Sequence, residues 1–170
     1  ALAQGAPITS DDPRLVSNLH ANLGGLYRMN AHPDLAREHM EKSISLLDQF
    51  NLLHINDSIP QIANYAMFLT EQQEPERGIS ELQKLSGIIK EYHSDDCLDY
   101  AKVQETLGTI YLMTANLPQA KTHFKRAFKI YEKIWADEPE MIEAKYQEIQ
   151  ELYPQIGFCI EKNLSGLLTK

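Results

Sequence analysis

The feature that most constrains this chain is a 42-residue repeat that occurs three times without insertion. The repeat holds in eight registers, and in nearly all of them residues 42 positions apart match in size and apolarity. The registers are Leu23, Tyr65 and Leu107; Gly24, Ala66 and Gly108; Tyr27, Leu69 and Tyr111; Ala36, Gly78 and Ala120; Met40, Leu82 and Phe124; Ser43, Leu85 and Ala127; Leu46, Ile88 and Ile130; and Phe50, Tyr92 and Ile134. A repeat of this length indicates small structural units that stack on their neighbours.

Each copy predicts a pair of antiparallel helices. Apolar residues spaced three and four apart, such as Leu19, Leu23 and Leu26, form one helical stripe. A proline stands at the start of each second helix, where its missing N–H is tolerated; these are Pro33, Pro75 and Pro118. The expected helices are 13–29, 33–50, 58–72, 75–93, 97–114, 117–135 and 139–153, followed by a shorter one at 155–168.

The third copy resembles the tetratricopeptide repeat consensus through Leu107-Gly108, Tyr111, Ala120, Phe124 and Ala127. Copies one and two depart from that consensus, with Met40 and Ser43 in the first and Tyr65-Ala66 and Gly78 in the second. The 42-residue length is similar to the kinesin-light-chain type of this repeat. The resemblance implies an all-α fold: a right-handed α-solenoid of antiparallel helix pairs, with three repeats and C-terminal capping helices.

The repeat register also predicts the domain organisation. Residues 1–12 are expected to be an N-terminal tail or the end of a preceding repeat, and 13–136 hold three repeats at about 13–54, 55–96 and 97–136. Residues 137–170 are expected to form a degenerate fourth repeat that caps the array. Two roles remain open for the last helix: Ile156, Ile160, Leu164 and Leu167 pack back as a cap, or Leu167 and Leu168 join two chains in a homodimer.

Composition narrows the class of partner and the compartment. A net charge of -8 argues against nucleic acid, whose phosphates need clustered Lys and Arg. Apolar runs are short and broken by charge, so no membrane span is expected. Cys97 and Cys159 lack metal-type spacing and are interpreted as reduced thiols, which favours a cytoplasmic location. The first residue is Ala1 rather than Met, as expected of an excised or processed piece.

No arrangement of residues in the sequence predicts catalysis. The sequence has no HExxH pair, phosphate loop or nucleophile motif, so no enzyme activity, cofactor or metal site is expected. His32 and His39 are seven apart across a proline turn, which is a poor spacing for a metal. The paired acids Asp95-Asp96 are expected to cap the helix that follows them rather than act as acid and base.

The first helix of each copy is expected to line the concave side of a stacked array, where residues not needed for packing can contact a ligand. The candidate groove residues are Asn18, Asn22 and Arg28 in copy one, Asn64 and Met67 in copy two, and Lys102, Glu105, Thr109 and Met113 in copy three. Asn22 and Asn64 share one repeat position, and Thr106 is its third member. In peptide-binding tetratricopeptide modules an asparagine at this position often holds the ligand backbone; the alternative is that both are solvated groove residues.

The charged residues of the groove give opposing predictions for the charge of the ligand. Arg28 and Lys102 favour an acidic peptide, whereas Glu71 and Glu105 oppose it. The predicted function is therefore a protein–protein interaction scaffold that binds a peptide or partner protein in the groove. The alternatives are an oligomerising or structural segment, and the peptide-sensing part of a larger bacterial regulator.

Overall fold

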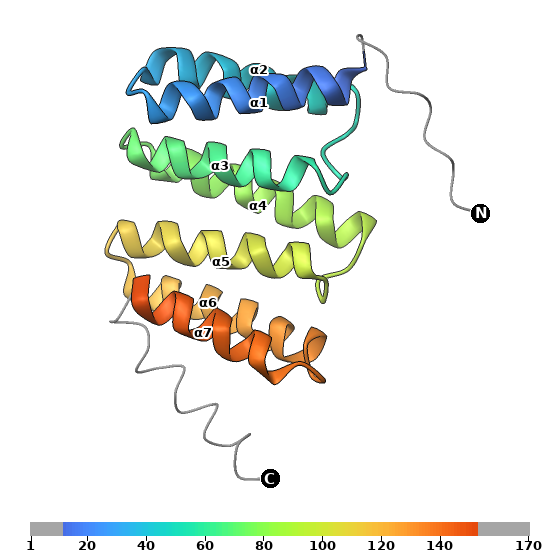
Figure 1. Cartoon of the computed structure of the whole chain (residues 1–170), viewed down its shortest axis with the longest axis vertical. Coiled ribbons are helices and arrows are strands. Elements are labelled where there is room, and N and C mark those ends of the chain that lie inside the picture. The colour runs from blue at the N-terminus through green and yellow to red at the C-terminus, as the bar shows by residue number, and fades with distance from the viewer. Residues whose placement is uncertain (1–11, 153–170) are drawn as a thin grey trace, which may run out of the picture. The chain divides into compact units, whose positions relative to one another are not determined.

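The computed structural model describes residues 12–152, and every regular element in this range is a helix. The helices are α1 (Pro13–Met29), α2 (Pro33–Gln49), α3 (Ser58–Glu71), α4 (Pro75–Tyr92), α5 (Leu98–Met113), α6 (Leu117–Ile134) and α7 (Pro139–Leu152). The sequence-based boundaries are confirmed to within one residue, apart from the end of α7, which coincides with the last described residue. Figure 1 shows the order of the helices along the chain. The expected helix at 155–168 lies outside the described residues.

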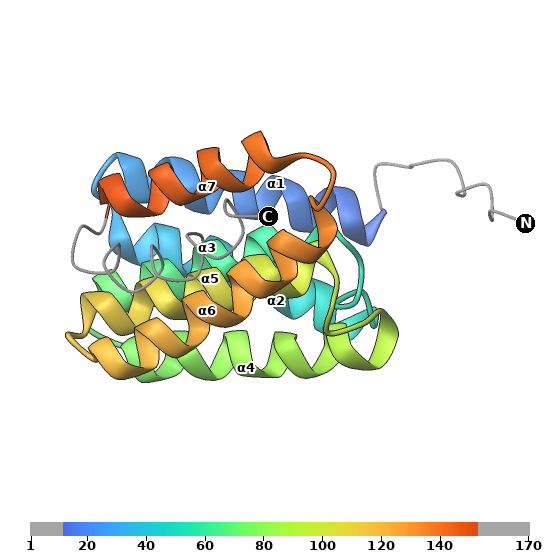
Figure 2. The same cartoon turned by 90° about the horizontal axis from the view of Figure 1, so that it is seen from below.

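The chain forms two compact units that divide inside α4, Ala1–Ile88 and Ile89–Lys170. In the N-terminal unit α1 packs along α2, and the two run in opposite directions (Figures 1 and 2). α3 packs on α2 through a buried cluster in which Ala36 and Met40 meet Tyr65, Phe68 and Leu69. Burial of these apolar side chains is the main stabilising contribution to the pairing. In this unit α1, α2 and α3 therefore all contact one another.

Small residues set how closely the helices of a pair approach. A Cβ added at Gly24 would lie 2.6 Å from Cγ of Met40, and one at Gly108 would lie 2.8 Å from the Phe124 ring. At Gly78 it would meet the carbonyl oxygen of Ala66 at 2.6 Å. All three distances are shorter than van der Waals contact, so helix crossing leaves no room for a side chain at these positions.

The turn within each copy has the same backbone geometry. Ala31, Gln73 and Ala115 are 42 residues apart and all have positive φ, at 57°, 65° and 58°. In each turn the amide after this residue bonds back to the last helical turn, as in His32 N to the carbonyl oxygen of Tyr27 at 2.9 Å. This is the Schellman pattern, which satisfies carbonyls at a helix end and usually uses glycine. The proline that starts the next helix follows two or three residues later.

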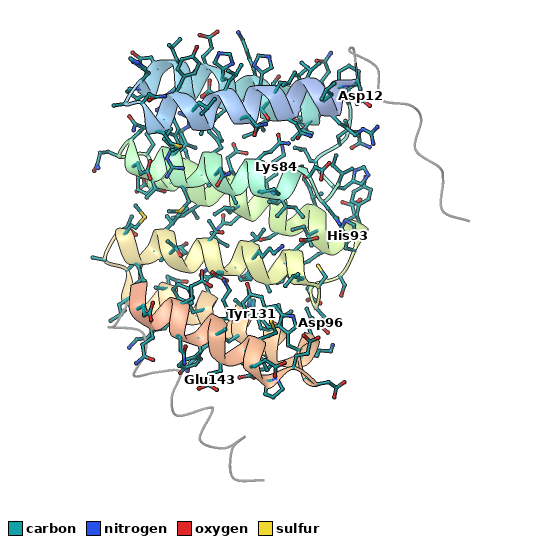
Figure 3. All side chains as sticks on the ribbon, viewed as in Figure 1. Asp12, Lys84, His93, Asp96, Tyr131 and Glu143 are labelled. Atoms are coloured by element: carbon teal, nitrogen blue, oxygen red, sulfur yellow. The ribbon has the colours of Figure 1, made fainter. Side chains whose placement is uncertain are left out.

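The C-terminal unit contains the pair α5–α6, with α7 packed against α6. Tyr146 of α7 lies edge-on to Phe128 with ring centroids 5.4 Å apart, and Ile149 is buried. Tyr131 of α6, labelled in Figure 3, has Trp135 as its stacking partner, with ring centroids 4.7 Å apart. Helix α7 therefore covers part of the apolar surface of this unit, as a capping helix does, while Leu167 and Leu168 lie outside the described residues.

One expected helix cap is wrong. The N-cap of α5 is Cys97, whose Sγ accepts a hydrogen bond from Tyr100 N at 3.4 Å. The Asp96 carboxylate instead accepts from Lys133 Nζ, in the same unit. The expectation failed because the helix begins one residue later than the sequence indicated, so neither acid stands at the capping position. Cys97 is a free thiol, and Cys159 lies outside the described residues.

Candidate functional site

A pocket of about 530 Å³ opens in the N-terminal unit between α1 and α3. Its volume lies in the range typical of ligand-binding pockets. Four of the predicted groove residues, Asn18, Asn22, Arg28 and Asn64, line it. The other lining residues are Ala21, Gly25, Met29, Met40, Ser43, Asp57, Pro60 and Gln61. The repeat register therefore brings these predicted positions of copies one and two into one site, whereas Met67 is half-buried outside the pocket lining.

A hydrogen-bond network fixes one wall of the pocket. The Oε1 atom of Gln61 accepts from the hydroxyls of Ser17 at 2.8 Å and Ser43 at 2.5 Å. Its Nε2 donates to Oδ1 of Asn18 at 2.5 Å. Asn18 is therefore held by the protein itself and has less capacity for a ligand. Sequence reasoning missed this network because Gln61 occupies a position that is apolar in the other copies, Leu19 and Val103.

Asn22 and Asn64 are in the opposite situation. Both side chains are exposed at the pocket, and within residues 12–152 neither side-chain amide forms a hydrogen bond. Each amide offers a donor and an acceptor, the same two groups that a peptide unit presents. The pocket thus has two polar groups that can pair with a ligand without breaking an existing contact.

Charges at the pocket are largely compensated. Arg28 binds Glu71 through two hydrogen bonds, including Nε to Oε2 at 2.8 Å. Both side chains remain about one third exposed, at 32% and 36%, so solvent screens this pair. Asp57 adds a negative charge to the lining. The arginine that was expected to make the groove positive is therefore neutralised by a neighbouring carboxylate.

Most of the predicted residues on α5 have internal partners. Glu105 accepts from Tyr131 Oη at 2.6 Å and from Lys145 Nζ at 3.0 Å, so it ties α6 and α7 to α5. Thr109 donates to the carbonyl of Glu105 in its own helix at 3.1 Å. Lys102 lies 3.9 Å from Asp99, and Met113 is exposed. The contacts of Glu105 and Thr109 are structural, which leaves Lys102 and Met113 as the more accessible side chains of this set.

Burial and charge together shift the ionisation of the Glu105 cluster. Burial raises the pKa of the Tyr131 hydroxyl above its ordinary value, and the Glu105 carboxylate beside it raises the pKa further. Burial disfavours the charged form of Lys145, but Glu105 and Glu148 outweigh it and raise the pKa of that ammonium. The cluster therefore keeps a neutral phenol and a charged lysine across the neutral pH range.

Residues 58–133 match the tetratricopeptide repeat family. The crystal structure of BtubC (BKLC) from P. vanneervenii, a kinesin-light-chain-like protein, is similar at 17% identity and a TM-score of 0.72. That likeness covers 95% of this chain and 68% of the other. No curated protein sequence matches significantly. The family match makes residues 58–133 a tetratricopeptide repeat segment, and the predicted fold class, an all-α solenoid, is confirmed.

This fold supports a general role as a protein-interaction scaffold. No helix within residues 12–152 is long and apolar enough to cross a bilayer. Over the same residues, no three His, Cys, Asp or Glu side chains gather into a group that could hold a metal ion.

Proposed function

We propose that this chain binds an extended peptide segment of a partner protein, and that the pocket between α1 and α3 is where the peptide lies. The observation that supports this is the pair Asn22 and Asn64, which occupy one repeat position on two helices and have unpaired amides facing one pocket. Amides at such positions can bond to successive peptide groups of a strand-like ligand without reading its side chains.

The energetics favour these two amides over their polar neighbours. Asn18 already accepts from Gln61, and Arg28 is bound to Glu71, so a ligand would have to displace those contacts. Asn22 and Asn64 require no displacement within the described chain. Each hydrogen bond to a ligand contributes about 1 kcal/mol net, so two to four such bonds can change affinity by about tenfold or more.

The proposal is tested with peptides selected from a random library on the immobilised protein. The double variant Asn22→Ala with Asn64→Ala should weaken the selected peptide about tenfold or more in a titration. The matched control is Gln49→Ala with Gln83→Ala, which removes two exposed amides from the second helices and outside the pocket. The control should leave affinity unchanged. Equal binding by both double variants would remove the support for this site.

A further inference from the structure

Gly25 is a glycine that helix geometry and packing do not explain. It lies inside α1, where glycine disfavours the helix relative to alanine. A Cβ added there would meet no atom within 4 Å, and no described glycine has a positive φ. The neighbouring Gly24 differs, because Met40 and the Ala36 carbonyl leave it no room for a side chain.

Open space alone does not mark a site, as a second glycine shows. Gly87 in α4 also has nothing within 4 Å of an added Cβ, but it lies outside the pocket lining. Gly25 lines the pocket and occupies the repeat position that holds Met67 in copy two and Thr109 in copy three. Copy one thus lacks a side chain at the one place where such a side chain would enter the pocket.

Part of the pocket that Gly25 lines is apolar, and the charge of its arginine is compensated. Ala21, Met29, Met40 and Pro60 contribute apolar atoms to the lining. Met40 is 4% exposed and lies under the pocket, whereas Met29 is 84% exposed and stands at its edge. The positive charge of Arg28 is compensated by Glu71, and Asp57 disfavours a further carboxylate. A carboxylate on the ligand would lose hydration here without gaining a counter-ion.

We infer that the pocket selects a peptide with an uncharged apolar side chain, such as Leu or Met, inserted beside Gly25. This inference rests on the proposed function, because the amides of Asn22 and Asn64 would hold the backbone on either side of that residue. The missing Cβ at Gly25 lets the inserted side chain approach the backbone of α1 closely. Unbranched thioether side chains at Met29 and Met40 can adapt to its shape.

The first test reads the preference directly from a peptide array in which each position of a selected binder is replaced by every residue type. One position should accept Leu, Met, Ile or Phe and reject Asp, Glu, Lys and Arg. Selection of a charged residue at every sensitive position would overturn the inference while leaving a peptide-binding groove in place. If no peptide can be selected at all, the proposed function fails as well.

The second test changes Gly25 itself. Gly25→Leu places a side chain in the pocket and should weaken the selected peptide about tenfold or more, with an unchanged far-UV circular dichroism spectrum. The control is Gly87→Leu, which makes the same change at the other open helical glycine and should alter affinity less than about twofold. Equal affinity of both variants for a peptide that still depends on Asn22 and Asn64 would overturn this inference alone.

The third test locates the bound peptide without a variant. The protein has five methionines, of which Met29 and Met40 line the pocket and Met113 and Met141 belong to the other unit. In a sample labelled with ¹³C at the methionine methyl groups, the selected peptide should shift the Met29 and Met40 signals most. Shifts confined to Met113 and Met141 would place the peptide elsewhere and contradict the inference.

Discussion

The helix pairs α1–α2 and α5–α6 have the same turn and the same helix-crossing glycine, but residues at equivalent positions have different environments. Leu19 and Leu26 of α1 are 54% and 55% exposed. Their equivalents in α5, Val103 and Ile110, are 0% exposed. The repeat pattern therefore identifies which positions carry apolar side chains, while burial depends on what lies against each pair. An apolar stripe in the sequence therefore predicts a helix face that can pack against a neighbour, but it does not predict that this face is buried.

The two pairs also differ in the polar contact that joins their helices. In α1–α2, Nδ1 of His20 lies 2.8 Å from Nδ1 of His39, and His39 stacks on Tyr27. In α5–α6, Gln104 Oε1 lies 2.9 Å from Nδ1 of His123, and His123 stacks on Tyr111. The geometry repeats, but one pair carries two titratable rings and the other carries one.

The largest expected difference concerns the buried and exposed members of one repeat position. Ile110→Ala should lower the free energy of unfolding by about 2–5 kcal/mol, because it removes buried methylene groups and leaves a cavity. Leu26→Ala should change it by about 0.5 kcal/mol or less. Urea denaturation followed by circular dichroism measures both. Similar losses in the two variants would show that the exposed leucines of α1 are covered in solution.

Substitution of the helix-crossing glycines Gly24 and Gly108 by alanine should give a smaller difference in stability. Gly108→Ala forces a Cβ against the Phe124 ring and should cost about 1–3 kcal/mol. Gly24→Ala meets Cγ of Met40 at 2.6 Å and two backbone atoms of α2 at 3.2 Å, so its loss should be of similar size. Thermal denaturation ranks the two variants against Gly87→Ala, which should stabilise because nothing opposes its added methyl group. A gain in stability on either substitution, at Gly24 or at Gly108, would contradict this account of the packing.

Acidic pH should lower the stability of the pair α1–α2 through His20, the titratable ring that α5–α6 lacks. Burial lowers the pKa of His20, and the nearby His39 and Lys42 lower it further against the opposing effect of Glu38. The unfolded chain therefore binds a proton more readily than the folded one, and this contribution to stability is lost as pH falls below about 6.5.

The variant His20→Gln reproduces the Gln104–His123 contact and removes one titrating group. Between pH 7.5 and 5.5, the stability of α1 and α2 should fall less in this variant than in the wild type. Amide hydrogen exchange in these two helices measures the difference. The C-terminal unit is an internal reference, because the pKa of His123 is lowered by burial and by Arg126 and is untouched by the change. An unchanged pH dependence in α1 and α2 would mean that His20 does not carry the effect.

The smallest expected effect on stability concerns the turn inside each helix pair, and it should be the same in α1–α2 and α5–α6. Ala31 and Ala115 have φ of 57° and 58°, a region where residues other than glycine are strained. Replacing either one with glycine should stabilise the protein by about 0.5–1 kcal/mol, after allowing for the greater freedom of glycine in the unfolded chain. Differential scanning calorimetry would detect the gain. Destabilisation by either change would argue against the left-handed turn.

Much of this fold was accessible from sequence because its signals are periodic. The spacing of Leu23, Tyr65 and Leu107 predicted the helix pairs, and Pro33 and Pro75 marked the first residues of α2 and α4. The same register predicted that Asn22 and Asn64 occupy equivalent positions on neighbouring first helices, and both line the pocket. Periodicity predicts such features because every copy packs against its neighbours through equivalent positions.

Features that depart from the 42-residue repeat could not be predicted from the sequence. Gln61 stands at an apolar position, and only the structure shows that it joins Ser17, Ser43 and Asn18. Glu105 was predicted to face a ligand, although its partners Tyr131 and Lys145 come from other helices. Such contacts depend on side chains distant in sequence, and neither spacing nor propensity encodes them.

The stacked pair Tyr131 and Trp135 has a practical consequence for optical work on this protein. Trp135 is the only tryptophan in the chain, and it belongs to the C-terminal unit, whereas the pocket lining of the N-terminal unit contains no aromatic residue. Tryptophan emission, excited selectively over tyrosine, is thus a reporter of one unit. Occupancy of the pocket is best followed with a fluorophore carried by the ligand, and a change in Trp135 emission on binding would reveal communication between the two units.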